Sequence, residues 1–575
     1  MQIRTAFPYE TTCEDVRIPL PDGTRLYARI WRPVTEEPVP VLLEYLPYRL
    51  GEWTAPRDAQ RHPWYAGHGY ASVRVDIRGH GNSEGLPGDE YDATELADGV
   101  AVVNWLAAQP WCTGKVGMFG ISWGGFNALQ IAALAPEPLK AIVTVCSTDD
   151  RYDNDVHYMG GSVLGVDMHA WAATMLAFTC RPPDPAHLGE EWRPLWLKRL
   201  ETLQPPIHTW LAHQTRDAYW RHGSVCEDYS AVRAAVLAVG GWHDPYRDTV
   251  LRLVEHLPGP AAGLIGPWSH QYPDRGLPPG PAFPFGNDAD LPPDQRDEDA
   301  KSACFDFPVP KDGPVEILGR PRVRLRLRSH APRGQVVARL CDVAPDGSST
   351  LVTRGALNLS ARHGRDRVEP WPEGAVEDVQ FELNAIGHAF PPGHRIRLAV
   401  SSAYWPWIWP QPGSAGFTLH PDGSTLELPV RTPTTDTITF AGPEQSAPLN
   451  VVLPEPEQQR PERRIVRDVA AGTWHLEVDP RYGGTRVHPD GLEFTEDALE
   501  TYTVHERDPL SARTRSDWTI RLHRPGLGWD VMIRTRSEIT ADAEDFVTAN
   551  EVTCREGDEI VFHRTWDKRI PRTAG

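Results

Sequence analysis

The chain has few of the features that mark metal, redox or cofactor proteins. Its 575 residues contain eight cysteines, but no two of them form a C-x-x-C pair or a spacing typical of zinc ligands. A P-loop and a dinucleotide-binding fingerprint are also missing. We therefore expect a function that needs neither a metal ion nor an organic cofactor.

Long apolar runs and an excess of positive charge are missing as well. No stretch is long enough for a transmembrane helix, and the first residues lack the apolar core of a signal peptide. We expect a cytoplasmic protein with reduced thiols. The formal net charge of −20 argues against nucleic-acid partners and against binding to anionic membranes. The basic run Arg322–Arg328 alternates with apolar residues, which predicts an amphipathic strand rather than a nucleic-acid site.

The pattern along the chain predicts several domains of different type. Strands and helices alternate in residues 1–148 and again in 231–275, which is typical of an α/β fold. Residues 149–230, between these two segments, are rich in tryptophan and helical in spacing, which predicts a helical cap that shapes a substrate pocket. Further along come a Pro-rich linker at 276–300, a β-sandwich at 301–453 with hairpin signals at Asp346-Gly347 and Asp422-Gly423, and an accessory β-rich domain at 465–575.

The sequence Gly120-Ile121-Ser122-Trp123-Gly124 has the pattern G-x-S-x-G. It follows a short apolar run and precedes a helical stretch, which is the context of a nucleophilic serine at a tight strand-to-helix turn. The glycines suit such a turn because they carry no Cβ. A glycine-rich turn of any doubly wound sheet remains the alternative on this motif alone.

Two further residues follow in the chain order expected of a Ser-Asp-His triad. Asp244 comes just after the apolar run 235–241, and His270 comes just after the run 263–268. Because sites in open α/β sheets form at the carboxyl ends of the strands, Ser122, Asp244 and His270 should meet at one edge. The alternatives are that Asp244 caps the next helix and that His270 is an ordinary loop histidine.

Taken together, the segments of the first 450 residues resemble those of the CocE/NonD hydrolases. This group includes cocaine esterase, α-amino-acid ester hydrolases and glutaryl-cephalosporin acylases, and it is related to the serine Xaa-Pro dipeptidyl-peptidases. The segments that carry the resemblance are PDGTRL at 21–26, DIRGHGNSEG at 76–85, WCTGKVGMFGIS at 111–122, GWHD at 241–244, GPWSH at 266–270 and PGHRIRLAVSS at 392–402. The resemblance implies an α/β-hydrolase domain with a helical cap, followed by a jelly-roll β domain. Relatives usually continue after the histidine with a helix and a further segment, and the sequence after His270 predicts a Pro-rich linker in their place.

The resemblance also implies an oxyanion hole, which stabilises the negative charge that acyl transfer places on the carbonyl oxygen. One donor is the backbone N–H of Trp123, the residue after the nucleophile. The second is a tyrosine hydroxyl after an early strand, and Tyr48 matches the family position. Tyr45 is the alternative, since it is also phenolic and close in sequence.

These observations predict a serine hydrolase that cleaves carboxylic ester or amide bonds of a small-molecule substrate through an acyl-enzyme. A dipeptidyl-peptidase that removes an Xaa-Pro pair is one alternative, and a non-catalytic binding protein on a hydrolase scaffold is another. The sequence leaves open whether the chain forms a homo-oligomer, as the accessory β domain would allow.

Family members that act on α-amino-acid esters bind the substrate ammonium with a carboxylate cluster, part of which lies two and three residues after the triad aspartate. Here these positions hold Tyr246 and Arg247, and neither can supply an anion. We therefore predict no preference for a free α-amine. Acidic residues that could still contribute to such a cluster occur early in the cap, at Asp149, Asp150, Asp153 and Asp155.

Overall fold

The computed structural model describes all residues except 154, 271–293, 414–415, 433, 435–437, 455–462 and 480–483. Its N-terminal half is built on an eight-stranded sheet with the order β11-β10-β7-β6-β4-β5-β3-β2. The strands are β2 (Thr11–Pro19), β3 (Arg25–Pro33), β4 (Val39–Leu46), β5 (Ala71–Asp76), β6 (Cys112–Ile121), β7 (Leu139–Val145), β10 (Ala235–His243) and β11 (Ala261–Ser269). The strands from β5 to β11 along this order are parallel, whereas β2 and β3 pair antiparallel.

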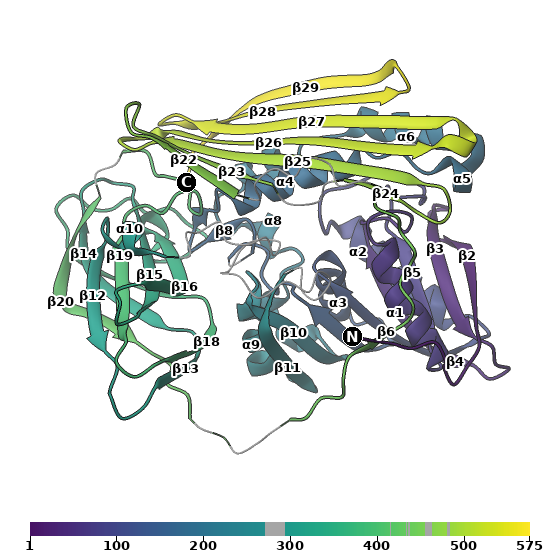
Figure 1. Ribbon diagram of the computed structural model, residues 1–575, viewed down its shortest axis with the longest axis horizontal. Coiled ribbons are helices and arrows are strands. Elements are labelled where there is room, and N and C mark those ends of the chain that lie inside the picture. The colour runs from purple at the N-terminus through teal and green to yellow at the C-terminus, as the bar shows by residue number, and fades with distance from the viewer. Residues whose placement is uncertain are drawn as a thin grey trace.

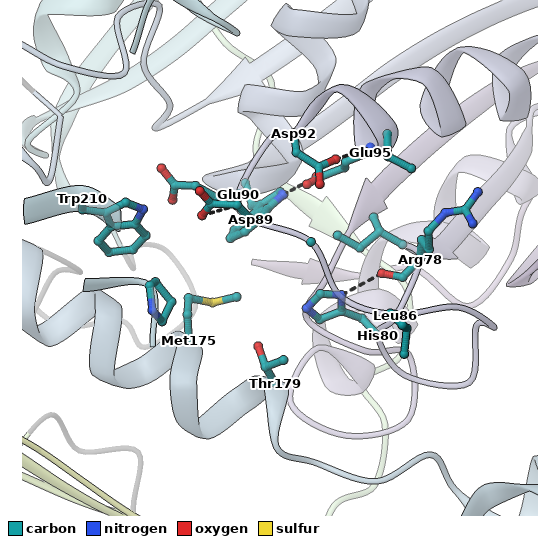
Figure 2. Close-up of a pocket in the computed structure, with 15 residues that line it drawn as sticks. Arg78, His80, Leu86, Asp89, Glu90, Asp92, Glu95, Met175, Thr179 and Trp210 are labelled. Carbon is teal, nitrogen blue, oxygen red and sulfur yellow. Dashed lines mark hydrogen bonds between the residues drawn. The ribbon is translucent and has the colours of Figure 1, made fainter. Parts of the chain in front are cut away.

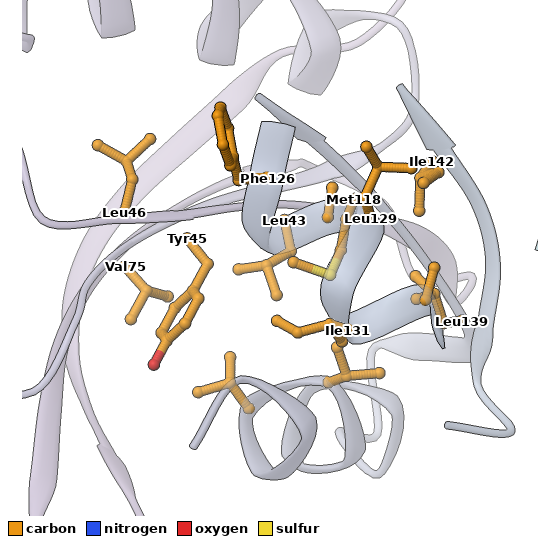
Figure 3. Packing of buried hydrophobic residues seen from close by; sticks show 14 of the residues in the cluster. Leu43, Tyr45, Leu46, Val75, Met118, Phe126, Leu129, Ile131, Leu139 and Ile142 are labelled. Carbon is orange, nitrogen blue, oxygen red and sulfur yellow. The ribbon is translucent and has the colours of Figure 1, made fainter. Parts of the chain in front are cut away.

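Helices cover this sheet and bury a continuous core. They are α1 (Ala55–Gly67), α2 (Ala93–Ala107), α3 (Trp123–Ala133) and α9 (Arg247–His256). Figure 3 shows the packing of α3 against the sheet, where Phe126, Leu129 and Ile131 meet strand residues such as Met118 and Ile142. Since parallel strands need cover on both faces, their apolar runs read as nearly continuous in the sequence.

The insert between β7 and β10 forms the cap. Its elements are β8 (Tyr158–Met159), β9 (Ser162–Val163), α4 (Asp167–Thr179), α5 (Pro185–Leu188), η1 (Gly189–Glu191), α6 (Trp192–Thr202), α7 (Ile207–Ala212), α8 (Ala218–Arg221), η2 (Val225–Glu227) and η3 (Tyr229–Ala231). In α4 almost every side chain is buried, because one side of the helix meets the hydrolase domain and the other meets the C-terminal sheet. No helix in the described part of the chain is both long and apolar enough to cross a bilayer.

A β-sandwich follows, with its core between two sheets of order β12-β19-β15-β16 and β17-β14-β20. Its elements are α10 (Arg296–Asp299), β12 (Ala303–Pro308), β13 (Val315–Gly319), β14 (Arg322–Ser329), β15 (Gln335–Val343), β16 (Ser349–Asn358), η5 (Leu359–Ala361), β17 (Glu377–Glu382), β18 (Ile386–Phe390), β19 (Arg395–Ser401) and β20 (Phe417–Glu427). The arginines of β14 are exposed and its apolar residues are buried, as the alternation predicts.

Two expectations for this region need correction. The hairpin predicted at Asp422-Gly423 is wrong, because these residues lie inside β20, where the register against β14 shifts. Residues 294–300 are not linker, since α10 packs into the sandwich and the buried Gln295 accepts a hydrogen bond from Arg339 at 2.8 Å. The rest of the predicted linker and the segment expected after His270 lie within 271–293, outside the described residues.

The chain ends in a second eight-stranded sheet, of order β22-β23-β25-β26-β27-β28-β29, with β24 also paired to β25. Its elements are β22 (Arg463–Asp468), β23 (Thr473–Val478), β24 (Gly484–Val487), β25 (Glu493–His505), β26 (Asp508–Arg524), η6 (Pro525–Leu527), β27 (Trp529–Ala541), β28 (Asp545–Glu556) and β29 (Glu559–Pro571). Figure 1 shows this sheet lying across the cap helices α4 and α6, above both other β layers. A short parallel pair, β1 (Gln2–Ile3) with β21 (Glu444–Gln445), joins the N-terminus to the segment that precedes the C-terminal sheet. The predicted class, an α/β-hydrolase with β-rich C-terminal regions, is confirmed.

Candidate active site

Ser122 lies at the sharp turn between β6 and α3, in a backbone conformation that few residues adopt. Its φ is +54° and its ψ is −127°, a combination that residues other than glycine rarely adopt, and its N–H donates to the carbonyl of Val145 at 2.9 Å. A Cβ on Gly120 would come within 2.5 Å of the backbone of Gly124, so the turn closes only with glycine there. The first glycine of the G-x-S-x-G pattern is therefore required by the close approach of two backbone segments.

Asp244 and His270 lie just beyond two neighbouring parallel strands, β10 and β11. The His270 Nδ1 and Asp244 Oδ2 atoms are 2.7 Å apart, and the aspartate is fully buried. The backbone N–H of Tyr246 donates to Asp244 Oδ1 at 2.7 Å, and its ring contacts the imidazole. The carboxylate thus fixes the orientation of the histidine ring, so that Nε2 is the atom that can act as a base.

Cys146, at the end of β7, is a part of this site that the sequence reasoning missed. Its backbone N–H donates to the carbonyl of Val239 at 2.8 Å, and its side chain hydrogen-bonds with Asp244. The ligand atoms of Cys146, Asp244 and His270 lie within 4.8 Å of one another, close enough to hold a metal ion. However, burial and the Asp244 charge raise the pKa of the thiol, which opposes the thiolate that metal binding needs. We interpret Cys146 as a thiol donor to the buried carboxylate.

A second group with metal-like spacing lies between β4 and α1, where Glu44, Asp58 and His62 are buried together. The carboxylate of Glu44 already contacts three guanidinium groups, those of Arg57, Arg61 and Arg74. Because these cations supply the positive charge that the carboxylates require, we interpret this group as a structural ion-pair network.

Tyr48 and the backbone N–H of Trp123 meet next to the serine. The phenol oxygen of Tyr48 hydrogen-bonds with the Ser122 side chain and accepts from the Trp123 N–H. Burial raises the pKa of Tyr48 to about 12, so the phenol keeps its proton at neutral pH. Two donors thus converge beside the nucleophile, where a carbonyl oxygen could accept from both.

The structure distinguishes Tyr48 from Tyr45, the other candidate for the second oxyanion donor. Tyr45 lies within β4, is fully buried in the core, and donates its hydroxyl to the carbonyl of Glu95 at 3.0 Å (Figure 3). Tyr48 lies three residues further on, beyond the end of the strand, where the chain reaches the edge of the sheet. The geometry supports the assignment of the second donor to Tyr48.

Glu95, on α2, hydrogen-bonds with side chains in the first turns of α3 and holds the start of that helix in place. Its Oε1 accepts from the indole N–H of Trp123 at 2.6 Å and from the amide of Asn127 at 2.9 Å, while Oε2 accepts from the N–H of Tyr91 at 3.0 Å. Burial raises the pKa of Glu95 to about 7, against the effect of these hydrogen bonds. No sequence motif signals this residue, because Trp123 and Asn127 lie 28 and 32 positions away along the chain.

Aromatic rings from the cap and the hydrolase domain surround these groups. Trp171 of α4 lies with its ring centroid 6.4 Å from that of Tyr48 and 6.2 Å from that of Trp123, and Tyr246 packs edge-on to Phe126 at 5.2 Å. The cap therefore supplies a wall of the site, which favours apolar substrate groups next to the nucleophile.

The acidic residues at the start of the cap are mostly engaged elsewhere. Salt bridges join Asp149 to Arg252, Asp150 to Arg216 and Asp153 to Arg365. Asp155 lies 3.5 Å from His157; although burial disfavours the charged imidazole, Glu90 and Asp155 raise the pKa of His157 to about 9. Arg247 is buried and donates to the carbonyl of Asp244 at 3.0 Å.

Comparisons with known proteins agree with this architecture. Residues 22–272 match the family described as X-Pro dipeptidyl-peptidase (S15 family), and residues 209–447 match its C-terminal non-catalytic domain. Cocaine esterase from Rhodococcus sp. (strain MB1 Bresler) is 25% identical over 69% of this chain and 91% of its own length. Both family matches end before the C-terminal sheet begins.

Solved structures of similar fold include an α-amino acid ester hydrolase, with a TM-score of 0.56, 17% identity, and coverage of 75% of this chain and 98% of its own. A CocE/NonD family hydrolase from Staphylococcus aureus has a TM-score of 0.57 and 16% identity, and covers 73% of this chain and 94% of its own. Over residues 22–447 the chain is therefore similar to the S15 peptidases and to cocaine esterase, which are serine hydrolases, and its fold is that of the CocE/NonD structures.

Proposed function

We propose that the protein hydrolyses a carboxylic ester or amide of a small molecule, with Ser122 as the nucleophile. The observation that carries the proposal is the meeting of the Tyr48 hydroxyl and the Trp123 N–H at Ser122, on the sheet edge that also holds the Asp244–His270 pair. A nucleophile, an oriented base and two oxyanion donors are the groups that acyl transfer requires.

In the proposed mechanism, His270 Nε2 takes the proton of the Ser122 hydroxyl as its oxygen attacks the carbonyl carbon. Asp244 stabilises the imidazolium, and Tyr48 and Trp123 donate to the oxyanion of the tetrahedral intermediate. His270 then returns the proton to the leaving group, which departs as an alcohol or amine. Water activated by the same histidine hydrolyses the acyl-enzyme and frees Ser122.

A dipeptidyl-peptidase activity is the second candidate, because both matched family segments carry that description. Such an enzyme must bind the free ammonium of a peptide. Three of the four early cap aspartates are paired with arginines, and the fourth contacts His157, so the structure favours a substrate without this group. The similarity to cocaine esterase and to the S15 peptidases disfavours the non-catalytic alternative.

A fluorophosphonate probe tests the proposal, since it reacts with activated serines. We expect mass spectrometry to place the label on Ser122, and Ser122→Ala to lose the label and about 10⁶-fold in turnover. Ser230→Ala, in an exposed turn, is the control and should keep both. Label on another serine, or near wild-type esterase activity in Ser122→Ala, would refute the assignment. Hydrolysis rates for esters and for Xaa-Pro amides, measured in parallel, decide between the esterase and the dipeptidyl-peptidase.

For its setting, we infer a cytoplasmic protein. All eight cysteines have free thiols, which fits a reducing compartment. Assembly into a homo-oligomer stays a prediction that sedimentation can check.

A further inference from the structure

A cavity of about 130 Å³ adjoins Trp123 without including the nucleophile, the base or Tyr48. Met175 and Thr179 of α4 form one wall and Trp210 of α7 forms another, while His80 and the segment 86–95 close the opposite side (Figure 2). The cavity is thus separate from the triad but shares the residue whose backbone is the proposed oxyanion donor.

The cavity carries an excess of negative charge. The residues that line it include four acidic ones, Asp89, Glu90, Asp92 and Glu95, and one arginine, Arg78, whose guanidinium points away from the cavity in Figure 2. That guanidinium is already bound by two other carboxylates, those of Asp22 and Asp98, outside the cavity.

Glu90 is compensated, because it pairs with Arg151 and with His157, each at 3.2 Å. Asp89 and Asp92 form no ion pair with any basic residue in the described ranges. Asp89 accepts from the Tyr219 hydroxyl at 2.7 Å and from the N–H of Glu90 at 2.9 Å, which leaves lone pairs on both oxygens. Burial and the neighbouring Glu90 raise the pKa of Asp89, the mark of a carboxylate short of positive charge.

Two buried polar atoms at the cavity lack hydrogen-bond partners. Trp210 is 1% exposed and His80 is 8% exposed, and neither the indole Nε1 nor the imidazole Nε2 has a partner within the described part of the chain. Figure 2 shows both nitrogens turned toward the interior of the cavity. His80 Nδ1 donates to the carbonyl of Arg78, and burial lowers the pKa of His80 to about 3. Its Nε2 therefore presents a lone pair.

The lining thus combines acceptors with the rings of Trp123 and Trp210, whose faces attract cations. We propose that this cavity binds a small organic cation, a primary ammonium or a guanidinium. The cation would donate to Asp89 and to His80 Nε2, and a hydroxyl or water beside it would accept from the Trp210 N–H. Nothing comparable favours an anion, since the guanidinium of Arg78, the one arginine among the lining residues, is neutralised by Asp22 and Asp98.

The cation has two possible sources. It can be part of the substrate, remote from the scissile carbonyl, or a separate effector that acts through Trp123. The choice between these two sources rests on the proposed function, whereas the proposal that the cavity binds a cation does not rest on it. A remote amine is also compatible with the lack of an anchor at the α position.

Calorimetric titration of full-length Ser122→Ala with methylammonium and methylguanidinium chloride, at fixed ionic strength, tests binding without catalysis. We expect saturable binding that weakens at least tenfold when Asp89→Asn is added. Asp228→Asn, which removes the same charge from an exposed turn, is the matched control and should bind as its parent. Thr179→Met, which fills the cavity without changing charge, should abolish binding. Heats equal to those of sodium chloride would overturn the proposal. Binding by Asp89→Asn and Thr179→Met as tight as that of their Ser122→Ala parent would also overturn it.

Kinetics of the wild-type enzyme identify the source. If the cation belongs to the substrate, methylammonium raises the KM of an ester with a remote amine and leaves a neutral ester unchanged. If it is an effector, methylammonium changes the kcat of the neutral ester. Absence of esterase activity would refute the proposed function and leave the calorimetric result to decide on the cation site.

Discussion

The hydrolase sheet and the C-terminal sheet each contain eight strands but use them differently. In the first, parallel strands from distant segments end at one edge, and each delivers a single side chain or turn to the site. In the second, neighbouring strands pair antiparallel, and burial alternates along them, so that one face packs on the cap. A parallel sheet concentrates chemistry at its strand ends, whereas an antiparallel sheet offers a face that can cover another domain.

The two regions are nevertheless connected through aromatic contacts. Trp518 of β26 packs against Phe178 of α4 with ring centroids 5.5 Å apart, and Phe178 lies 5.9 Å from Trp53. Trp53 in turn packs edge-on to Tyr48 at 5.4 Å. Substitutions can therefore test whether the C-terminal sheet only stabilises the cap or also positions the oxyanion hole.

The largest expected effect is that of Trp518→Ala on stability. Truncating this buried ring should lower the free energy of unfolding by about 3–5 kcal/mol, measured by denaturant titration. The kcat at a temperature where the variant is folded should stay within a few-fold of wild type, because no catalytic group is lost. Trp566→Ala, at a half-buried site of the same cluster, is the control and should cost less. A tenfold fall in kcat for Trp518→Ala would mean that the sheet positions Tyr48.

Tyr48→Phe should show the opposite behaviour, a loss of activity rather than of stability. Loss of one oxyanion donor should lower kcat about 10²–10³-fold with a much smaller change in KM, because the interaction forms in the transition state. Tyr45→Phe is the matched control. It loses its hydrogen bond to Glu95 and about 1 kcal/mol of stability, but little kcat. The reverse pattern in steady-state kinetics would transfer the role to Tyr45.

Glu95 should make stability depend on pH. Its carboxyl has an ordinary pKa of 4.5 when unfolded and a pKa raised to about 7 when folded, so the folded state binds the extra proton between these values. Stability should therefore fall as pH rises from about 4.5 to 7 and level off above, by at most about 3 kcal/mol. Glu95→Gln should flatten this slope in thermal denaturation curves measured across the range. An unchanged slope would show that Glu95 does not titrate there.

The smallest expected effect concerns the α-amine. We expect kcat/KM for phenylglycine methyl ester to stay within about tenfold, or 1.4 kcal/mol, of that for phenylacetic acid methyl ester near neutral pH. The physical reason is that arginines or a charged histidine already compensate the cap aspartates. A larger preference for the amine would point to Asp155 as an anchor.

Parts of this architecture could be predicted because their signals are local. The glycines around Ser122, the apolar runs before Asp244 and His270, and the alternation in β14 each lie within a dozen residues. Cys146 and Glu95 carry no such signal. Their contacts with Asp244 and Trp123 arise only when β7 packs beside β10 and when α2 packs beside α3. The hairpin predicted at Asp422-Gly423 failed for a related reason, since a bulge and a turn use the same residues.

The sequence by itself determined the fold class, the similarity to serine hydrolases and the three residues proposed for the triad, because strand periodicity and a tight turn are encoded locally. Tertiary structure alone decided that Tyr48 rather than Tyr45 reaches Ser122, since three residues of chain separate the core of the sheet from its edge. It also decided that the C-terminal sheet covers the cap and that Asp89 and His80 share a cavity with Trp210. These contacts join segments far apart in the chain, and packing, which no local pattern records, brings them together.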